Sequence, residues 1–214
     1  MKKFIPLLFC SLFALWSCKL EDTFTQTNVQ DLVTFHEGQL INDYGYPLNV
    51  VQDAVGSSKW QIPEARFYVI YDILNRQLDI YLKELVRSTI LEPLAYNEEV
   101  EYAKDPLVPV MAGYSGGYLN LGFNYYRAKN SNNAHPIYFY SEVKNSHLYI
   151  HVVHEGNNED PVHMAEGDLE EQSGVFSLNL KNVPEYTQTT LIVQCLETKS
   201  DGTYEIIEET YDIH

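Results

Sequence analysis

Leu119-Asn120-Leu121-Gly122-Phe123-Asn124-Tyr125 alternates apolar or aromatic side chains with small or polar ones. Successive side chains of a β-strand point to opposite faces, so this alternation predicts a strand with one buried face. The same pattern recurs at residues 148–153 and 176–180, and strand-like runs lie at residues 107–112, 137–143, 190–197 and 204–211. About seven strands at this spacing, the last two separated by an Asp-Gly turn, predict an antiparallel, immunoglobulin-like β-sandwich in the second half of the chain.

The first half is also predicted to contain strands, with one ambiguous segment. Strand-like runs lie at residues 32–37, 46–52 and 67–71, and Asn42-Asp43-Tyr44-Gly45 supplies a turn between the first two. Within residues 73–87, leucines at 74, 78, 82 and 85 fit a helix, whereas Leu78, Ile80 and Leu82 alternate as in a strand. Composition leaves both interpretations open.

A domain boundary is predicted between residues 88 and 109. Pro93, Pro106 and Pro109 lie there, together with the acidic run Glu98-Glu99-Val100-Glu101. Prolines and clustered charges interrupt regular structure. We therefore expect a small domain over residues 32–94 and the β-sandwich over residues 95–214, which makes the fold class all-β.

The N-terminus has the three parts of an export signal. Two lysines precede an apolar run at residues 4–16, and small Ser17 precedes Cys18. The apolar run is too short to span a bilayer. Leu15-Trp16-Ser17-Cys18 resembles a bacterial lipobox, which predicts a lipoprotein signal peptide over residues 1–17, lipidation at Cys18 and a polar tether over residues 18–31. The alternative is a simple secretory peptide with a coincidental cysteine.

Charge and the residues after Cys18 bear on location and partners. The formal net charge is −16, and removal of Lys2 and Lys3 with the leader makes it −18, because 14 − 2 = 12 basic residues then face 30 acidic ones. Such a surface repels phosphate backbones and argues against a nucleic-acid partner. Lys19 stands where an Asp would signal inner-membrane retention, and the acidic pair at residues 21–22 resembles a surface-export tag. We expect an outer-membrane protein, anchored by its N-terminal lipid and exposed either to the periplasm or at the cell surface.

Cys195 is the one cysteine of the mature chain besides the acylated Cys18, so no disulfide is predicted in the folded part. It shares a predicted strand face with Leu191 and Val193, which favours a buried, inert thiol over a nucleophile.

Gly113-Tyr114-Ser115-Gly116-Gly117 matches G-x-S-x-G, the nucleophile elbow of hydrolases. That motif requires a strand-to-helix turn, but the residues after it alternate as a strand. We therefore predict a glycine-rich hairpin turn here and no catalytic serine.

Histidines near residue 154 offer a weak metal hypothesis. His151 and His154 form an H-x-x-H pair, but residues three apart on a strand point to opposite faces and cannot share an ion. His154 could instead join His163, with Glu155 and Asp160, around a loop. A solvated polar loop is the alternative, as it is for the acidic run at residues 166–171, which lacks the order of a known Ca²⁺ loop. We expect no cofactor.

Tyrosine is abundant, with 17 residues, many of them in the predicted strands. An exposed row of tyrosines suits sugar rings or a protein partner. Ordinary strand propensity, or contact with the other domain, would use the same residues. The candidate ligand-binding residues are Tyr114, Tyr118, Tyr138 and Tyr140.

Four segments besides the lipobox resemble NigD-like lipoproteins: RFYVIYDIL at 66–74, SGGYLNL at 115–121, GVFSLNL at 174–180 and DGTYE at 201–205. The resemblance covers essentially the whole mature chain. It implies an N-terminal OB-like barrel followed by a C-terminal β-sandwich, and it favours strand for residues 73–87. It carries over no catalytic residues, and the family's name suggests a bacteriocin-immunity role.

The leading functional hypothesis is a non-enzymatic binding lipoprotein with an extracytoplasmic protein or glycan partner. One alternative is an immunity-type protein that binds a basic toxin, steered by the negative charge. Another is a hydrolase of envelope glycans, which needs a carboxylate pair that the sequence leaves unidentified. An acidic pair in a cleft between the domains would favour the enzyme, and a flat, tyrosine-rich exposed patch would favour the binder.

Overall fold

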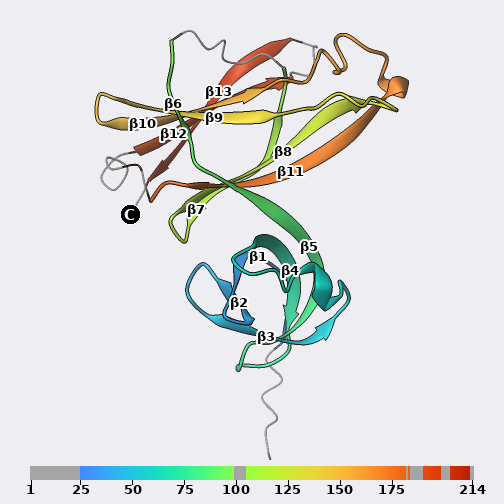
Figure 1. The fold of residues 1–214 in the computed structure, drawn as a ribbon, viewed down its shortest axis with the longest axis vertical. Coiled ribbons are helices and arrows are strands. Elements are labelled where there is room, and N and C mark those ends of the chain that lie inside the picture. The colour runs from blue at the N-terminus through green and yellow to red at the C-terminus, as the bar shows by residue number, and fades with distance from the viewer. Residues whose placement is uncertain (1–24, 99–104, 182, 184–189, 199–202, 213–214) are drawn as a thin grey trace, which may run out of the picture.

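The computed structural model describes residues 25–98, 105–181, 183, 190–198 and 203–212. A small β-barrel and a larger β-sandwich lie end to end along the long axis of the molecule (Figure 1). The described residues form strands and two short 3-10 helices, so the predicted all-β fold is confirmed. No helix among them is long and apolar enough to cross a membrane.

The barrel consists of five strands and one 3-10 helix. β1 pairs with β2 and β4, β2 pairs with β3, and β4 pairs with β5. A parallel pairing of β3 with β5 closes the ring, which is consistent with the OB-like barrel expected from the sequence. The elements are β1 (Gln26–His36), β2 (Gln39–Asn42), β3 (Pro47–Asp53), η1 (Ser57–Lys59), β4 (Arg66–Ile73) and β5 (Asp79–Leu91).

The β-sandwich packs two sheets face to face. β5 continues from the barrel into the first sheet, whose order is β3-β2-β1-β4-β5-β11-β8-β7, and the second sheet has the order β13-β12-β10-β9-β6. The elements are β6 (Leu94–Ala95), β7 (Val108–Ser115), β8 (Tyr118–Ala128), β9 (Ile137–Lys144), β10 (His147–His154), η2 (Glu166–Asp168), β11 (Leu169–Asn179), β12 (Thr190–Thr198) and β13 (Tyr204–Asp212).

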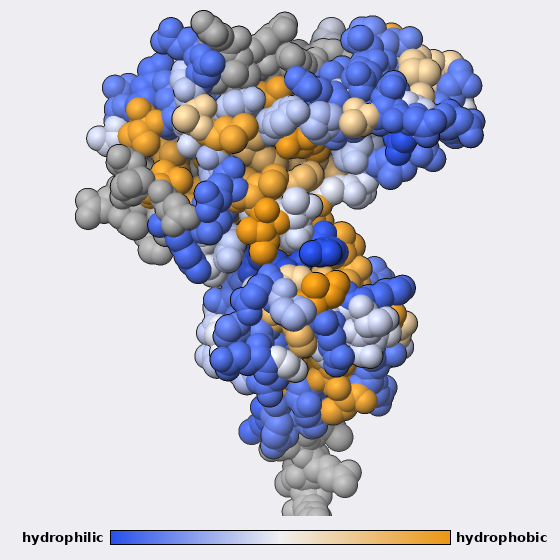
Figure 2. Space-filling view, viewed as in Figure 1, coloured by the Kyte–Doolittle hydropathy of each residue, from blue (hydrophilic) through white to orange (hydrophobic). Residues whose placement is uncertain are grey.

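Each lobe has its own core. Alternating inward residues of β4 and β5 fill the barrel, among them Phe67, Val69 and Leu82. The strand that opened the sequence argument places Leu119, Leu121 and Phe123 in the core of the sandwich, as the alternation predicted. In the space-filling view the molecule narrows where the lobes meet, and apolar surface lies on both sides of this waist (Figure 2).

The two domains share one sheet, which the sequence did not predict. The last residues of β5 pair in parallel with β11, with Thr89 opposite Phe176 and Leu91 opposite Leu178. The change from barrel to sandwich therefore occurs within a continuous strand, before the predicted boundary between residues 94 and 95. Pro93 follows the end of that strand at Leu91, but it does not separate the domains.

Two other predictions need correction. The expected tether over residues 18–31 is wrong for residues 26–31, which form the start of β1 and pair with β4. Apart from Val29, which packs against the barrel core, their side chains are polar, but pairing with β4 satisfies backbone groups of this segment. The sandwich is also not purely antiparallel, because β10 pairs with β12 and β6 with β9 in parallel.

The ambiguous segment is strand. β4 ends at Ile73, a turn follows, and β5 begins at Asp79. Leu78 lies in that turn with φ +60°, so it belongs to neither a helix nor the strand.

Candidate functional site

A buried arginine joins the two domains. Arg66, at the start of β4, is 1% exposed and forms an ion pair with Asp43 from the β2–β3 loop. Its Nη1 donates to Asp43 Oδ1 at 2.6 Å, its Nη2 donates to Asp43 Oδ2, and its Nε donates to Ser177 Oγ of β11 at 3.0 Å. Further bonds to Thr34 and Asn120 leave each of its three guanidinium nitrogens with an acceptor.

A chain of polar side chains from the sandwich completes this junction. Ser115 donates to Asp43, and Asn120 Nδ2 donates to Ser115 Oγ at 3.0 Å. Ser177 Oγ donates to Asn120 Oδ1 at 2.8 Å and also bonds Ser88 Oγ of β5 at 2.8 Å. Because every member has partners, the network fixes one relative position of barrel and sandwich.

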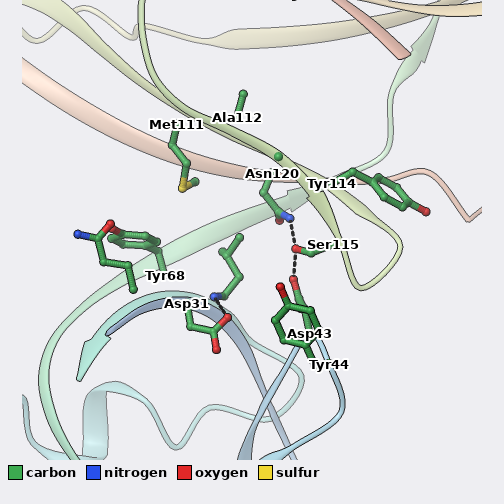
Figure 3. Close-up of a pocket in the computed structure, with 12 residues that line it drawn as sticks. Asp31, Asp43, Tyr44, Tyr68, Met111, Ala112, Tyr114, Ser115 and Asn120 are labelled. Atoms are coloured by element: carbon green, nitrogen blue, oxygen red, sulfur yellow. Dashed lines mark hydrogen bonds between the residues drawn. The ribbon is translucent and has the colours of Figure 1, made fainter. Parts of the chain in front are cut away.

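An open pocket of about 340 Å³ lies beside this network, between the domains (Figure 3). Its volume is near the small end of the roughly 300–1,000 Å³ that ligand pockets occupy. The barrel lines it with Gln30, Asp31, Leu32, Asp43, Tyr44 and Tyr68. The sandwich lines it with Met111, Ala112, Gly113, Tyr114, Ser115 and Asn120.

The alternation along β7 decides which side chains face the barrel. Ala112 and Tyr114 pack against the sandwich core, so Met111, Gly113 and Ser115 lie on the opposite face of the strand. The bond from Ser115 to Asp43 agrees with this. A Cβ added at Gly113 would meet no atom within 4 Å, which leaves open space at this point of the wall.

Asp31 is the second carboxylate of the pocket. It accepts hydrogen bonds from the Leu32 N–H at 2.8 Å, Tyr71 Oη at 3.1 Å and Asn42 Nδ2 at 3.2 Å. Burial raises the pKa of Asp31, the three hydrogen bonds lower it, and the nearby Asp43 carboxylate raises it, with a net shift upwards. Burial and Asp31 in turn raise the pKa of Tyr71.

The four predicted tyrosines lie in three different places. Tyr114 borders the pocket, but its ring packs against the sandwich core. Tyr118 lies at the junction, with the Arg66 guanidinium carbon 4.4 Å and Lys181 Nζ 5.2 Å from its ring centroid. Tyr138 and Tyr140 are half-buried on β9, with ring centroids 6.5 Å apart. The structure therefore does not bring the four together into one tyrosine surface.

The two histidines of the metal hypothesis have separate partners. His154 Nδ1 bonds the Pro106 carbonyl at 3.2 Å, and His163 Nδ1 bonds Asp160 Oδ2 at 2.8 Å. Within the part of the chain that the structure describes, no three His, Cys, Asp or Glu side chains are grouped to hold a metal ion.

Sequence reasoning missed a second buried polar cluster, around Glu159. This carboxylate accepts bonds from the Ala128 N–H at 2.7 Å, Ser131 Oγ at 2.7 Å, Asn133 Nδ2 at 2.6 Å and His135 Nε2 at 3.0 Å. Burial raises the pKa of Glu159, but these bonds outweigh burial and lower the pKa to about 2. The cluster ties the loop after β10 to the loop after β8.

The G-x-S-x-G match is a hairpin turn, as predicted. β7 ends at Ser115, β8 begins at Tyr118, and Gly116 and Gly117 have φ of +58° and +82°. Ser115 bonds the Asp43 carboxylate rather than a histidine.

Cys18 and the Asp201-Gly202 turn lie outside the described residues. Cys195 lies in β12, whose side chains are not described, so its predicted burial stays a prediction.

The described fold defines a class of two-domain, all-β proteins in which one sheet runs from a barrel into a sandwich. Residues 90–208 match the family described as the NigD-like C-terminal beta sandwich domain. This match covers more than half of the chain, so the chain belongs to the NigD-like family, as the sequence motifs predicted. No curated protein matches it.

Solved structures share the fold over nearly the whole described chain. A NigD-like immunity protein from Bacteroides caccae is 18% identical, with a TM-score of 0.59 over 87% of this chain and 99% of that one. A candidate toxin-related protein from Parabacteroides distasonis is 19% identical, with a TM-score of 0.57 over 86% and 93%. A candidate lipoprotein from Bacteroides fragilis is 13% identical, with a TM-score of 0.51 over 88% and 99%.

Proposed function

We propose that this protein is a lipid-anchored outer-membrane protein that binds an extracytoplasmic protein partner at the pocket between its domains, without catalysing a reaction. The observation that carries this proposal is the pocket itself, whose two walls are held in place by a shared strand and a buried ion pair. Because the walls of such a site are already ordered, binding does not carry the entropic cost of ordering them.

The test is a substitution that fills part of the pocket. Gly113→Leu adds a side chain where the structure has open space, and the glycine has no positive φ to forbid it. Gly167→Leu is the matched control, because Gly167 also has open space around it but does not line the pocket.

The lipidated protein would be crosslinked in intact cells exposed to culture supernatant. We expect a protein that is captured by the wild type and by Gly167→Leu but not by Gly113→Leu. Equal capture by all three proteins, or capture of nothing, would contradict binding at the pocket.

The anchor has its own test. Cys18→Ala should abolish incorporation of a labelled fatty acid and release the protein from membranes, because acyl chains hold it there at about 0.8 kcal/mol per buried methylene. Cys10→Ala, within the same leader, should leave both unchanged. Continued labelling of the Cys18→Ala protein would show that the lipid is elsewhere.

An immunity-type role is the finer version of this proposal. The structural neighbour described as a NigD-like immunity protein and the acidic charge of this chain support it. If it is correct, deleting the gene should sensitise cells to a toxin released by neighbouring strains, and the Gly113→Leu protein should fail to restore protection. Restored protection by the Gly113→Leu protein would show that immunity does not depend on the pocket.

A glycan hydrolase is the second candidate, because the pocket holds two carboxylates in different environments. Asp43 is paired with Arg66, whereas the pKa of Asp31 is raised. A glycoside hydrolase needs such a pair, with one carboxyl group that holds a proton as the general acid and one that stays ionised. Reducing-end release from envelope glycans, lost in Asp31→Asn, would establish this activity. No release by the wild-type protein from purified envelope glycans would exclude it for that substrate class.

A further inference from the structure

We propose that the pocket receives a lysine or arginine side chain of the protein partner, with Asp31 as its counter-charge and Tyr44, Tyr68 and Met111 as the walls along its stem. This inference rests on the partner-binding function proposed above and adds the chemistry of the contact.

The first argument is the balance of charge in the pocket. Its lining residues include two carboxylates and, among the residues that the structure describes, no lysine, arginine or histidine. The charge of Asp43 is already matched by Arg66, both of whose terminal nitrogens donate to it. Asp31 accepts bonds from a backbone amide, an amide side chain and a phenol, all of them neutral. Among the described residues, the Asp31 carboxylate therefore has neutral hydrogen-bond partners and no cationic one.

The second argument is the energetic cost of ionising Asp31. Burial and the neighbouring Asp43 raise the pKa of Asp31, so its ionised form is disfavoured where it stands. A cation near it would favour the ionised form, whereas an anion would add a third negative group to the same wall. Outside the lining, the Glu84 carboxylate is near enough to Tyr68 to raise its pKa together with burial, burial being the larger cause.

The third argument is the shape and surface of the walls. Tyr44 is 78% exposed at the tip of the β2–β3 loop and borders the pocket on the barrel side, with Tyr68. Met111 lies opposite, on the barrel-facing side of β7 (Figure 3). A lysine or arginine has an apolar stem and a charged end, which tyrosine faces and a carboxylate match. Within this protein, Arg66 and Lys181 already stack on Tyr118 in this way.

The probes are four tripeptides, Gly-X-Gly with blocked ends, in which X is lysine, arginine, norleucine or glutamate. Norleucine keeps the four-carbon stem of lysine without its ammonium group. The chain has three methionines, Met1 in the leader, Met111 in the pocket and Met164 outside it, so methyl-labelled methionine gives a pocket signal and an internal control. Met111→Leu assigns the signal.

We expect the lysine and arginine peptides to shift the Met111 methyl signal of the mature protein saturably and to leave Met164 unchanged. Asp31→Asn should weaken this binding about tenfold or more, as removal of one charge-assisted contact does. Glu170→Gln removes one exposed carboxylate outside the pocket and should not weaken it. Tyr44→Ala should weaken binding, and Tyr46→Ala, which changes an exposed tyrosine outside the pocket, should not.

Three outcomes would overturn the inference: an equal shift with the norleucine peptide, a shift with the glutamate peptide, or no shift with any peptide. If Asp31→Asn lowers the melting temperature, the Tyr44→Ala and Tyr46→Ala pair decides the matter, because neither residue is buried. Loss of partner capture in Gly113→Leu, without binding of basic peptides, would keep the proposed function and reject this chemistry. Binding of basic peptides by the wild type, with unchanged partner capture by Gly113→Leu, would keep this chemistry and reject partner binding at the pocket.

Discussion

Two buried carboxylates, Asp43 and Glu159, are used in different ways. Asp43 meets a full cation, Arg66, and its partners come from another element of the barrel, β4, and from the sandwich. Glu159 meets mostly neutral donors, and all of them lie 24 to 31 residues before it in the sandwich. The first carboxylate therefore holds two domains together, whereas the second holds two loops of one domain. The elements that contribute the hydrogen-bond partners of a buried carboxylate therefore indicate which parts of the fold it stabilises.

The largest effect is expected from removing the cation of the junction. Arg66→Ala leaves Asp43 buried without its counter-charge, which costs about 3–5 kcal/mol for a buried pair. Denaturant unfolding should show this loss, with the barrel and the sandwich separating into two transitions. Arg87→Ala, an exposed arginine on β5, should change stability by less than about 0.5 kcal/mol. A single cooperative transition of near wild-type stability in Arg66→Ala would mean that β5 alone joins the domains.

A smaller loss, without separation of the domains, is expected at the other carboxylate. Glu159→Ala leaves four donors without their acceptor and should cost about 3 kcal/mol. The ordinary pKa of Glu is 4.5 and the pKa of Glu159 is lowered to about 2, so its stabilisation is complete above pH 4.5 and lost as pH falls towards 2. The variant should lack this acid dependence, measured by urea unfolding at a series of pH values. Glu166→Ala, an exposed carboxylate nearby, serves as control, and an unchanged acid dependence in Glu159→Ala would assign it to other groups.

The closeness of the junction can be tested with a pair of glycines. Gly45→Ala places a side chain at φ +83° with no atom within 4 Å, so it should cost about 1 kcal/mol from backbone strain alone. Gly116→Ala adds, at φ +58°, a Cβ that would lie 2.7 Å from Asp43 Oδ1. It should cost about 2 kcal/mol or more, because the ion pair must move as well. Equal melting temperatures for the two variants would show that the Arg66–Asp43 junction accommodates the added Cβ without an extra loss of stability.

The smallest effect is expected at His154, and it depends on pH. Burial is the main cause that lowers its pKa below the ordinary 6.5, with His135 adding to it and the Pro106 carbonyl, Asp105 and Asp160 opposing it. The unfolded chain therefore binds a proton more readily, and stability is lost as pH falls from 6.5 through the lowered pKa. The slope is at most about 1.4 kcal/mol per pH unit. In His154→Gln this part of the slope should be absent from melting curves, while His147→Gln, a partly exposed histidine, should retain it.

The strands were predictable because their signal is local. The alternation of Leu119, Leu121 and Phe123 needs only neighbouring residues to be recognised, and the glycine-rich turn at 113–117 lies between two such runs. The ambiguity of residues 73–87 had a local cause too, since leucines at both spacings occur there and a family resemblance was needed to favour strand. The start of β1 was missed because its polar residues are ordered by backbone pairing with β4.

The site was out of reach for a different reason. By sequence, Asp43 is an ordinary turn residue and Arg66 an ordinary charge at the start of a strand. Their contact spans 23 residues, and the further partners of Arg66 lie as far as 111 residues away. Tyr114 and Tyr118 were identified as aromatic residues of interest, but their side chains are committed to the sandwich core and to the junction.

The sequence by itself determined the all-β fold, the hairpin turns and the membership of a family, because alternation, glycines and short motifs act within a few residues of each other. Only the tertiary structure decided that one strand runs through both domains, that Arg66 is buried between them, and that Asp31 and Asp43 line one pocket. These features depend on which strands meet, and strands that meet in a sheet can come from any two places in the chain.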